Sequence, residues 1–152
     1  MKKVVLDTNV IVSAFLSPTG KPAALLLSVL LQELEIQYNT EIMIEYEQVL
    51  GRTKFSEKIK HTDVQAFLER LRDFGANIIN SRSTVAIPDE SDRKFYDVAK
   101  TANAILITGN KKHYPNEPFI QDPAEFFSNW KEEVYRLRAA LDIAEASGVS
   151  GD

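Results

Sequence analysis

Near its N-terminus the chain reads VVLDTNVIV (residues 4–12), an apolar run that three polar residues interrupt before it resumes. A short apolar run rich in β-branched residues is typical of a buried strand, and Asn9 is a suitable N-cap for a helix that begins at Val10. Asp7 is therefore expected at the carboxyl end of a strand, facing the N-terminus of the next helix. Ligands of open α/β sheets bind at that edge. The alternative is that Asp7 only caps the helix.

The composition limits the kinds of protein that this chain can be. Its 152 residues, 44% hydrophobic and 26% charged, fit one globular domain over residues 1–146 with a flexible tail over 147–152. No apolar run approaches the roughly 20 residues that span a bilayer. The lack of cysteine favours a cytoplasmic location and, with only two histidines, disfavours a zinc site. A net charge of −4 argues against broad attachment to nucleic acid, although local basic clusters can still bind phosphates.

Predicted strands alternate with predicted helices along the chain. Apolar runs predict strands at 4–6, 35–38, 77–80, 104–107 and 119–121. Helical spacing predicts helices at 10–16, 23–34 (deeply buried), 40–51, 63–74 and 90–102, and a C-terminal helix with the apolar stripe Trp130, Val134, Leu137 and Leu141. Such alternation is typical of parallel sheets with right-handed crossovers. We therefore expect an α/β fold, a three-layer α/β/α sandwich with a central parallel sheet of about five strands.

Three further polar residues are expected near the same sheet edge as Asp7. Glu45 borders the core face of the 40–51 helix, and Asn110 lies in the turn that follows the strand at 104–107. Asp92 lies on the core face of the 90–102 helix, although it could serve there only as a capping residue. Asp97 is predicted to lie on the far side of that helix. No basic residue is predicted among the converging acids.

Clustered carboxylates need compensation. Two of them about 4 Å apart repel by about 4 kcal/mol at an effective dielectric constant of 20, so the cluster must take up protons or hold a cation. Oxygen ligands without Cys or His favour Mg²⁺ or Mn²⁺. Such an ion suits phosphate chemistry, because it activates a water for attack on phosphorus and stabilises the oxyanions. The chain then needs no nucleophile of its own.

Together these motifs resemble the PIN domain. The resemblance rests on DTNV at 7–10, the Glu after the second strand, Asp92 eighteen residues before Asn110, and the ITGN turn at 107–110. Ser13-Ala14 and the stretches 45–52 and 108–113 are most similar to PIN proteins described as toxins of toxin–antitoxin systems. The resemblance covers residues 1 to about 130. It implies a metal-dependent ribonuclease for single-stranded RNA, a homodimer, and an antitoxin protein as partner.

The resemblance also implies roles for individual residues. Asp7, Glu45 and Asp92 match the metal-binding acids of the family, and Asn110 stands where the family often has Asp. An amide keeps an oxygen ligand but removes one charge, which should weaken a second metal site. Positions that support the site by hydrogen bonding are matched by Thr8, Asn9, Ser13 and Thr108.

Two basic clusters are candidates for contacts with RNA phosphates. We favour Lys111, Lys112 and His113, because they follow Asn110 directly. The second cluster includes Arg52 and Lys54 and is the weaker candidate, because a run of charges is usually a solvated face.

Two other enzyme classes with an early Asp fit the chain less well. A haloacid-dehalogenase-type phosphatase needs a second Asp two residues after Asp7, where this chain has Asn9. A response-regulator receiver needs an Asp after a middle strand, and none follows Ile78-Ile79. The possibility that stays open is a PIN-like scaffold that binds RNA or a protein without cleaving it, because Asn110 reduces the charge of the site.

Overall fold

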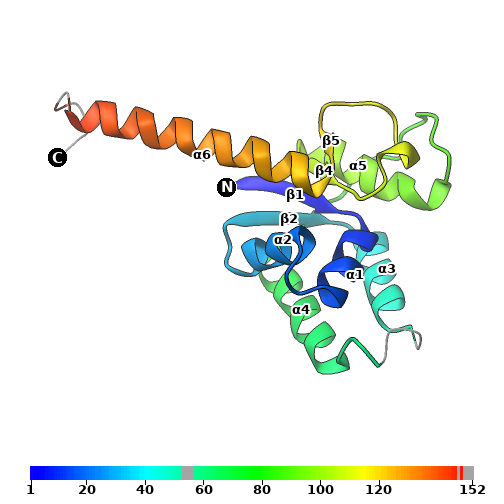
Figure 1. Ribbon diagram of the computed structural model, residues 1–152. Helices are drawn as coiled ribbons and strands as arrows, with labels where there is room; N and C mark the ends of the chain where they lie inside the picture. The colour runs from blue at the N-terminus through cyan, green and yellow to red at the C-terminus, as the bar shows by residue number, and fades with distance from the viewer. Residues whose placement is uncertain (53–56, 147, 149–152) are drawn as a thin grey trace.

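The computed structural model describes residues 1–52, 57–146 and 148, and Figure 1 shows their arrangement. A sheet of five parallel strands has the order β3-β2-β1-β4-β5. The strands are β1 (Lys2–Leu6), β2 (Leu34–Tyr38), β3 (Ala76–Asn77), β4 (Ile105–Ile107) and β5 (Ile120–Gln121). In the central β1, Val4 pairs with Ile36 of β2 and with Ile105 of β4. The chain thus winds from β1 toward β3 and then returns to add β4 and β5 on the other side of β1.

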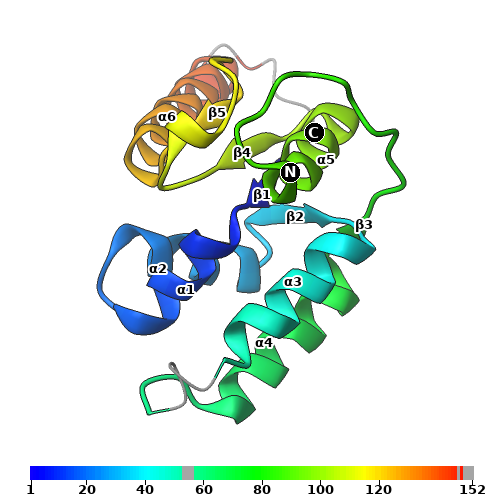
Figure 2. The same cartoon turned by 90° about the vertical axis from the view of Figure 1, so that its right-hand side faces the viewer.

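Helices cover both faces of this sheet, which confirms the predicted three-layer α/β/α sandwich. They are α1 (Thr8–Leu16), α2 (Lys21–Leu30), α3 (Thr40–Leu50), α4 (His61–Phe74), α5 (Arg93–Ala102) and α6 (Pro123–Ala146), with 3₁₀ turns η2 (Glu90–Asp92) and η3 (Lys111–His113). Helix α5 lies across β1, β2 and β4 on one face, while α2 and α4 pack against β2 from the other face (Figure 2). Helix α6 contacts β5 and α2.

The core lies on both sides of β1. Val4, Val5 and Leu6 are fully buried, as expected for a parallel strand with helices on each face. From α5 the buried residues include Phe95 and Val98, which confirms the predicted core face of that helix. Burial of this kind holds β1 in place, and with it the residue that follows the strand.

The structure corrects several predicted boundaries. Helix α1 begins at Thr8 with Asp7 as its N-cap, so Asn9 lies inside the helix. Helix α2 ends at Leu30, short of the predicted 34, and Leu27 on its outer side is exposed. The prediction of deep burial on most sides of this helix is therefore wrong.

Two other predictions fail in the second half of the sheet. The third strand is Ala76–Asn77 rather than 77–80, and the side chain of Ile79 is 96% exposed. Asp97 lies inside the protein rather than on the far side of α5: it is buried, and the Ser83 amide donates to its Oδ2 at 3.1 Å. It therefore anchors the loop that leads to α5.

The last helix combines a docked and an undocked part. Its start has a capping box, in which the Glu125 amide donates to Asp122 Oδ1 at 2.8 Å. Phe126 is fully buried, whereas Val134, Leu137 and Leu141 are 51–64% exposed. Figure 1 shows the later turns of α6 extending beyond the sheet. The apolar stripe therefore continues where the domain no longer covers it.

Two predictions concern residues that the structure does not describe. The predicted tail over 147–152 lies outside the described residues except for residue 148, and Lys54 lies outside them as well.

Within the described ranges no single helix is long and apolar enough to cross a membrane. The adjoining α1 and α2, bent by 103°, pass that test only when joined, by length and composition alone.

Candidate active site

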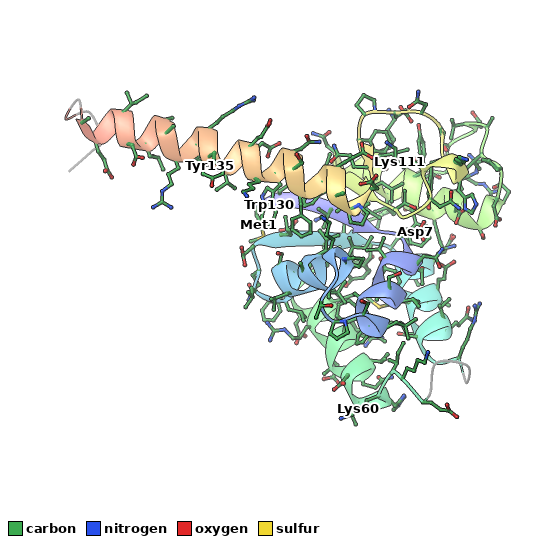
Figure 3. All side chains as sticks on the ribbon, viewed as in Figure 1. Met1, Asp7, Lys60, Lys111, Trp130 and Tyr135 are labelled. Carbon is green, nitrogen blue, oxygen red and sulfur yellow. The ribbon has the colours of Figure 1, made fainter. Side chains whose placement is uncertain are left out.

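The site is centred on Asp7, at the carboxyl edge of the sheet. Asp7 follows β1 and Thr108 follows β4, so the two residues flank the point at which the winding of the sheet reverses. The backbone brings them together, because the Asp7 amide donates to the Ile107 carbonyl at 3.0 Å. Figure 3 shows Asp7 and Lys111 at the end of the molecule away from Met1. This is the edge at which ligands bind in open α/β sheets.

Two hydroxyl groups orient the Asp7 carboxylate. Thr108 Oγ1 and the Tyr114 hydroxyl each donate to Asp7 Oδ2 at 2.9 Å. The Asn9 amide donates to Oδ1 at 3.3 Å and so caps α1. Asp7 is therefore both a helix cap and an oriented, buried carboxylate, and the two roles expected for this residue are compatible.

Two buried tyrosines surround this carboxylate. Burial raises the pKa of the Tyr114 hydroxyl, and the charges of Asp7 and Asp92 raise it further. Burial likewise raises the pKa of Tyr46, followed by the charges of Asp7 and Glu45. The Tyr46 hydroxyl donates to the Leu6 carbonyl. Both phenols thus remain hydrogen-bond donors at any physiological pH.

Glu45, on α3, is held by two donors. The Thr8 hydroxyl donates to its Oε2, and the Lys94 ammonium lies 2.8 Å from its Oε1. Lys94 also donates to the Ser91 carbonyl. The expectation that no basic residue lies among the acids is therefore wrong, because Lys94 is ion-paired with one of them.

Burial and the charges of the neighbouring acids change the pKa of Asp92. Burial raises the pKa of its carboxyl group to about 6, the charges of Asp7, Asp89 and Glu45 add to the shift, and His113 opposes it. Asp92 makes no side-chain cap to α5. Capping in this segment is done by Asp89, which accepts the Ser91 amide at 2.9 Å.

His113 links Asp92 to Asn110. Its Nδ1 lies 3.5 Å from Asp92 Oδ2, and its Nε2 lies 3.0 Å from Asn110 Nδ2. The backbone amide of Asn110 donates to Thr108 Oγ1 at 3.1 Å. The predicted turn thus reaches the acids through His113, which sequence reasoning assigned to the RNA phosphates.

The remaining predicted residues lie farther out. Asn9 contributes its backbone amide, and in the described part of the chain the exposed Ser13 has no hydroxyl hydrogen bond to the acids. Lys111 is ion-paired with Glu125 at 2.8 Å. Lys112 and Arg52 are exposed. Their proposed contacts with RNA stay predictions.

Sequence reasoning missed two residues that touch the acids. Tyr114 directly follows the KKH cluster, and its position next to a polar turn is the only signal that it carries. Nothing in the sequence indicated a role for Lys94, because a single lysine near a helix start is usually solvated. Its partner Glu45 is distant in the sequence, so only the fold brings them together.

The acids have the right chemistry for a divalent cation, but Glu45 is engaged elsewhere. Carboxylate oxygens are the ligands that Mg²⁺ and Mn²⁺ prefer. Burial raises the pKa of Asp92 most, and the charges of Asp7, Asp89 and Glu45 raise it further. Within residues 1–52, 57–146 and 148, however, no three acidic or histidine side chains are arranged to hold a metal ion. The donor set fits such an ion by its chemistry, and Glu45 is paired with Lys94.

Comparisons with known proteins agree with this architecture. The PIN domain model matches residues 3–112. An uncharacterized protein of Methanocaldococcus jannaschii is 32% identical over 114 residues, which cover 72% of this chain and 71% of that protein. No solved structure gives a significant match. PIN domains are generally nucleases that use divalent metal ions. With a match over most of its length, the chain belongs to the PIN domain family.

Proposed function

We propose that this protein is a divalent-metal-dependent endoribonuclease that cleaves single-stranded RNA. The observation that carries the proposal is the coupling of three carboxylates at the reversal point of the sheet. Burial raises the pKa of Asp92 most, and the charges of Asp7 and Glu45 raise it further, so both of these carboxylates lie within electrostatic range of Asp92. A cluster of this kind favours a divalent cation.

Each residue of the site has a proposed task. Asp7, Glu45 and Asp92 would hold Mg²⁺ or Mn²⁺, with the Asn110 amide as a weaker neighbour. When bound, the ion supplies Lewis-acid polarisation of the phosphate and lowers the pKa of water. Thr108 and Tyr114 fix the orientation of Asp7 through the hydrogen bonds described above.

The substrate would contact exposed basic residues as it reaches the site. Lys112 is exposed next to η3, and Arg52 is exposed beyond α3. Within the described residues neither side chain forms an ion pair, whereas Lys111 would first have to leave Glu125. Single-stranded RNA is proposed because the motifs of this chain resemble PIN toxins.

The same resemblance supports a biological role as the cytoplasmic toxin of a toxin–antitoxin pair. An antitoxin would then cover the site until it is degraded. Induced expression should arrest bacterial growth, and Asp7→Asn should relieve the arrest. Unaffected growth on expression of the folded wild-type protein would count against a toxin.

A second candidate function is a PIN-like scaffold that binds RNA without cleaving it. Two observations favour this function: Asn110 lacks the charge of an Asp, and the Lys94 ammonium already neutralises Glu45. A scaffold would bind RNA equally well with and without divalent ions.

The deciding experiment is cleavage of a fluorescently labelled single-stranded RNA in Mg²⁺, in Mn²⁺ and in EDTA. We expect cleavage that requires the ion and falls at least about a hundredfold in Asp7→Asn. Asp63→Asn is the matched control, because Asp63 is exposed on α4. It should retain full activity.

Three results would decide against a nuclease. Cleavage in EDTA, or equal cleavage by wild type and Asp7→Asn, would point to a contaminating enzyme. Binding of the RNA without cleavage under every condition would support the scaffold instead.

A further inference from the structure

Lys94 is the one feature of the site that the proposed nuclease does not need, yet it is firmly placed. Its side chain is only 11% exposed, and the ammonium lies 2.8 Å from Glu45 Oε1. The same nitrogen lies 5.1 Å above the centre of the Phe95 ring, within the range of a cation–π contact. A hydrogen bond to the Ser91 carbonyl completes its surroundings.

The position of this ammonium matters because of the charges around it. Glu45, which holds this ammonium, also accepts the hydroxyl of Thr8, the residue next to Asp7, and Lys94 itself follows Asp92 by two positions. All three carboxylates therefore lie near one positive charge. One positive charge inside such a group offsets part of their repulsion. A half-buried ion pair is also screened less by salt than an exposed one.

We propose that Lys94 is the internal counter-ion of the metal-free site and that a divalent cation must displace it from Glu45. The inference rests on the proposed function, since it concerns the same carboxylates. It accords with the described residues, in which no three acidic or histidine side chains are arranged to hold a metal ion and Glu45 is paired with an ammonium. Lys94 is a positioning residue in this scheme, because it acts through Glu45.

The structure also provides space for the displaced side chain. Lys94 lines a cavity of about 170 Å³ on the side of α5. Glu41 lines the same cavity and offers the ammonium another carboxylate, whereas Glu90 is already ion-paired with Arg82 and Arg93.

Manganese binding measured by calorimetry tests this competition. The experiment compares the wild type with Lys94→Met, which keeps the apolar stem but removes the charge. Lys94→Met should bind Mn²⁺ about tenfold more tightly, because the ion no longer competes with an ammonium. Lys100→Met is the matched control: Lys100 lies on the same helix, is 56% exposed and pairs with Glu117. Its affinity for Mn²⁺ should equal that of the wild type.

Thermal melting gives a second measurement that does not depend on activity. In EDTA, Lys94→Met should melt at a lower temperature than the wild type, because three carboxylates lose their counter-ion. Saturating Mn²⁺ should raise the melting temperature of Lys94→Met more than that of the wild type. Should Lys94→Met not fold, Lys94→Gln replaces it, since an amide can still donate to Glu45 without a charge.

The outcomes separate this inference from the proposed function. Equal or weaker Mn²⁺ binding by Lys94→Met, with normal binding by the wild type, overturns the counter-ion role and leaves the nuclease intact. Binding by Lys94→Met alone supports the role and shows that the wild type is blocked. A lack of binding by all the proteins, including the Lys100→Met control, removes the metal and the competition together.

Discussion

The pKa of Asp92 depends on the burial of its carboxyl group and on the charges around it. Its folded-state pKa of about 6 arises first from burial and then from neighbouring charges. The folded protein therefore keeps a proton on Asp92 up to about pH 6, whereas the unfolded chain releases it near pH 4. The resulting stability is fully present below about pH 4 and is lost as the pH rises through about 6.

The first prediction follows from this difference. Without metal, the free energy of unfolding of the wild type should fall by about 2 kcal/mol between about pH 4 and 7 relative to that of Asp92→Asn. Urea denaturation in EDTA at several pH values measures it. Parallel pH profiles for the two proteins would show that Asp92 is not perturbed. Asp89→Asn is a useful comparison, because the hydrogen bonds from Ser91 lower the pKa of Asp89.

A second prediction concerns Asn110. Asn110→Asp adds a charge on the far side of His113 from Asp92, where a second ion would bind. We expect nuclease activity at low Mg²⁺ to rise, and Asp7→Asn to abolish it in either background. The variant should be less stable without metal, because another carboxylate joins the cluster. Added Mg²⁺ should recover that loss. If neither activity nor metal-dependent melting changes, Asn110 does not act on the acids.

At the scale of elements, Gly75 joins α4 to β3 under steric constraint. A Cβ at this position would lie 2.6 Å from the Leu71 carbonyl oxygen, 2.9 Å from Tyr38 and 3.0 Å from Ile36. Its backbone φ of −81° is open to any residue. The predicted helix stop at Gly75 is therefore correct, but the cause is close packing of the helix end against β2 rather than a left-handed conformation.

The third prediction tests this packing. Gly75→Ala should lower the free energy of unfolding by about 1–3 kcal/mol, because backbone cannot yield as a flexible side chain does. Gly109→Ala is the control, since a Cβ there would meet nothing within 4 Å. Urea denaturation measures both. Equal stability of Gly75→Ala and the wild type would mean that the end of α4 shifts freely.

Elements were predictable from the sequence wherever a periodic pattern stayed regular. The strand before Asp7, the helix with Glu45 and the turn with Asn110 all follow from such patterns. The prediction failed where the geometry changed within a segment. The single helix predicted at 90–102 is a 3₁₀ turn followed by α5. A 3₁₀ turn advances by a different angle per residue, so Asp92 does not continue the spacing of α5. Asp97 lies within α5, and it is buried because the loop before this helix covers it, where the Ser83 amide donates to Asp97 Oδ2.

Edges of the sheet were also hard to predict. Ile78 and Ile79 have strong β propensity, yet β3 ends at Asn77 because it pairs with only the last residues of β2. The Ile78 amide makes one more bond, to the Tyr38 carbonyl. Propensity describes a side chain on a pleated surface, and it does not say where the neighbouring strand ends.

At the scale of the whole molecule, the undocked turns of α6 are the main unexplained surface. Apolar residues recur there at Val134, Leu137 and Leu141 with a spacing of three and four, which is typical of helices that pair. We propose that a second copy of the chain covers this stripe, in keeping with the expected homodimer.

The fourth prediction is a change of mass in solution. Light scattering should give twice 17.1 kDa for the wild type and a monomer for Leu137→Lys. Ala139→Lys adds the same charge on another side of α6 and should remain a dimer. A wild-type mass of 17.1 kDa at high protein concentration would rule out the homodimer.

The hydrogen bonds to Asp7 can form only late in the synthesis of the chain. Its two hydroxyl partners, Thr108 and Tyr114, are 101 and 107 positions later in the chain. At a synthesis rate of about 5–20 residues per second, they leave the ribosome roughly 5–20 s after Asp7. The strand β4 that carries Thr108 to the centre of the sheet emerges equally late. The carboxylate at the centre of the site therefore lacks both of its hydroxyl donors until most of the protein has been made.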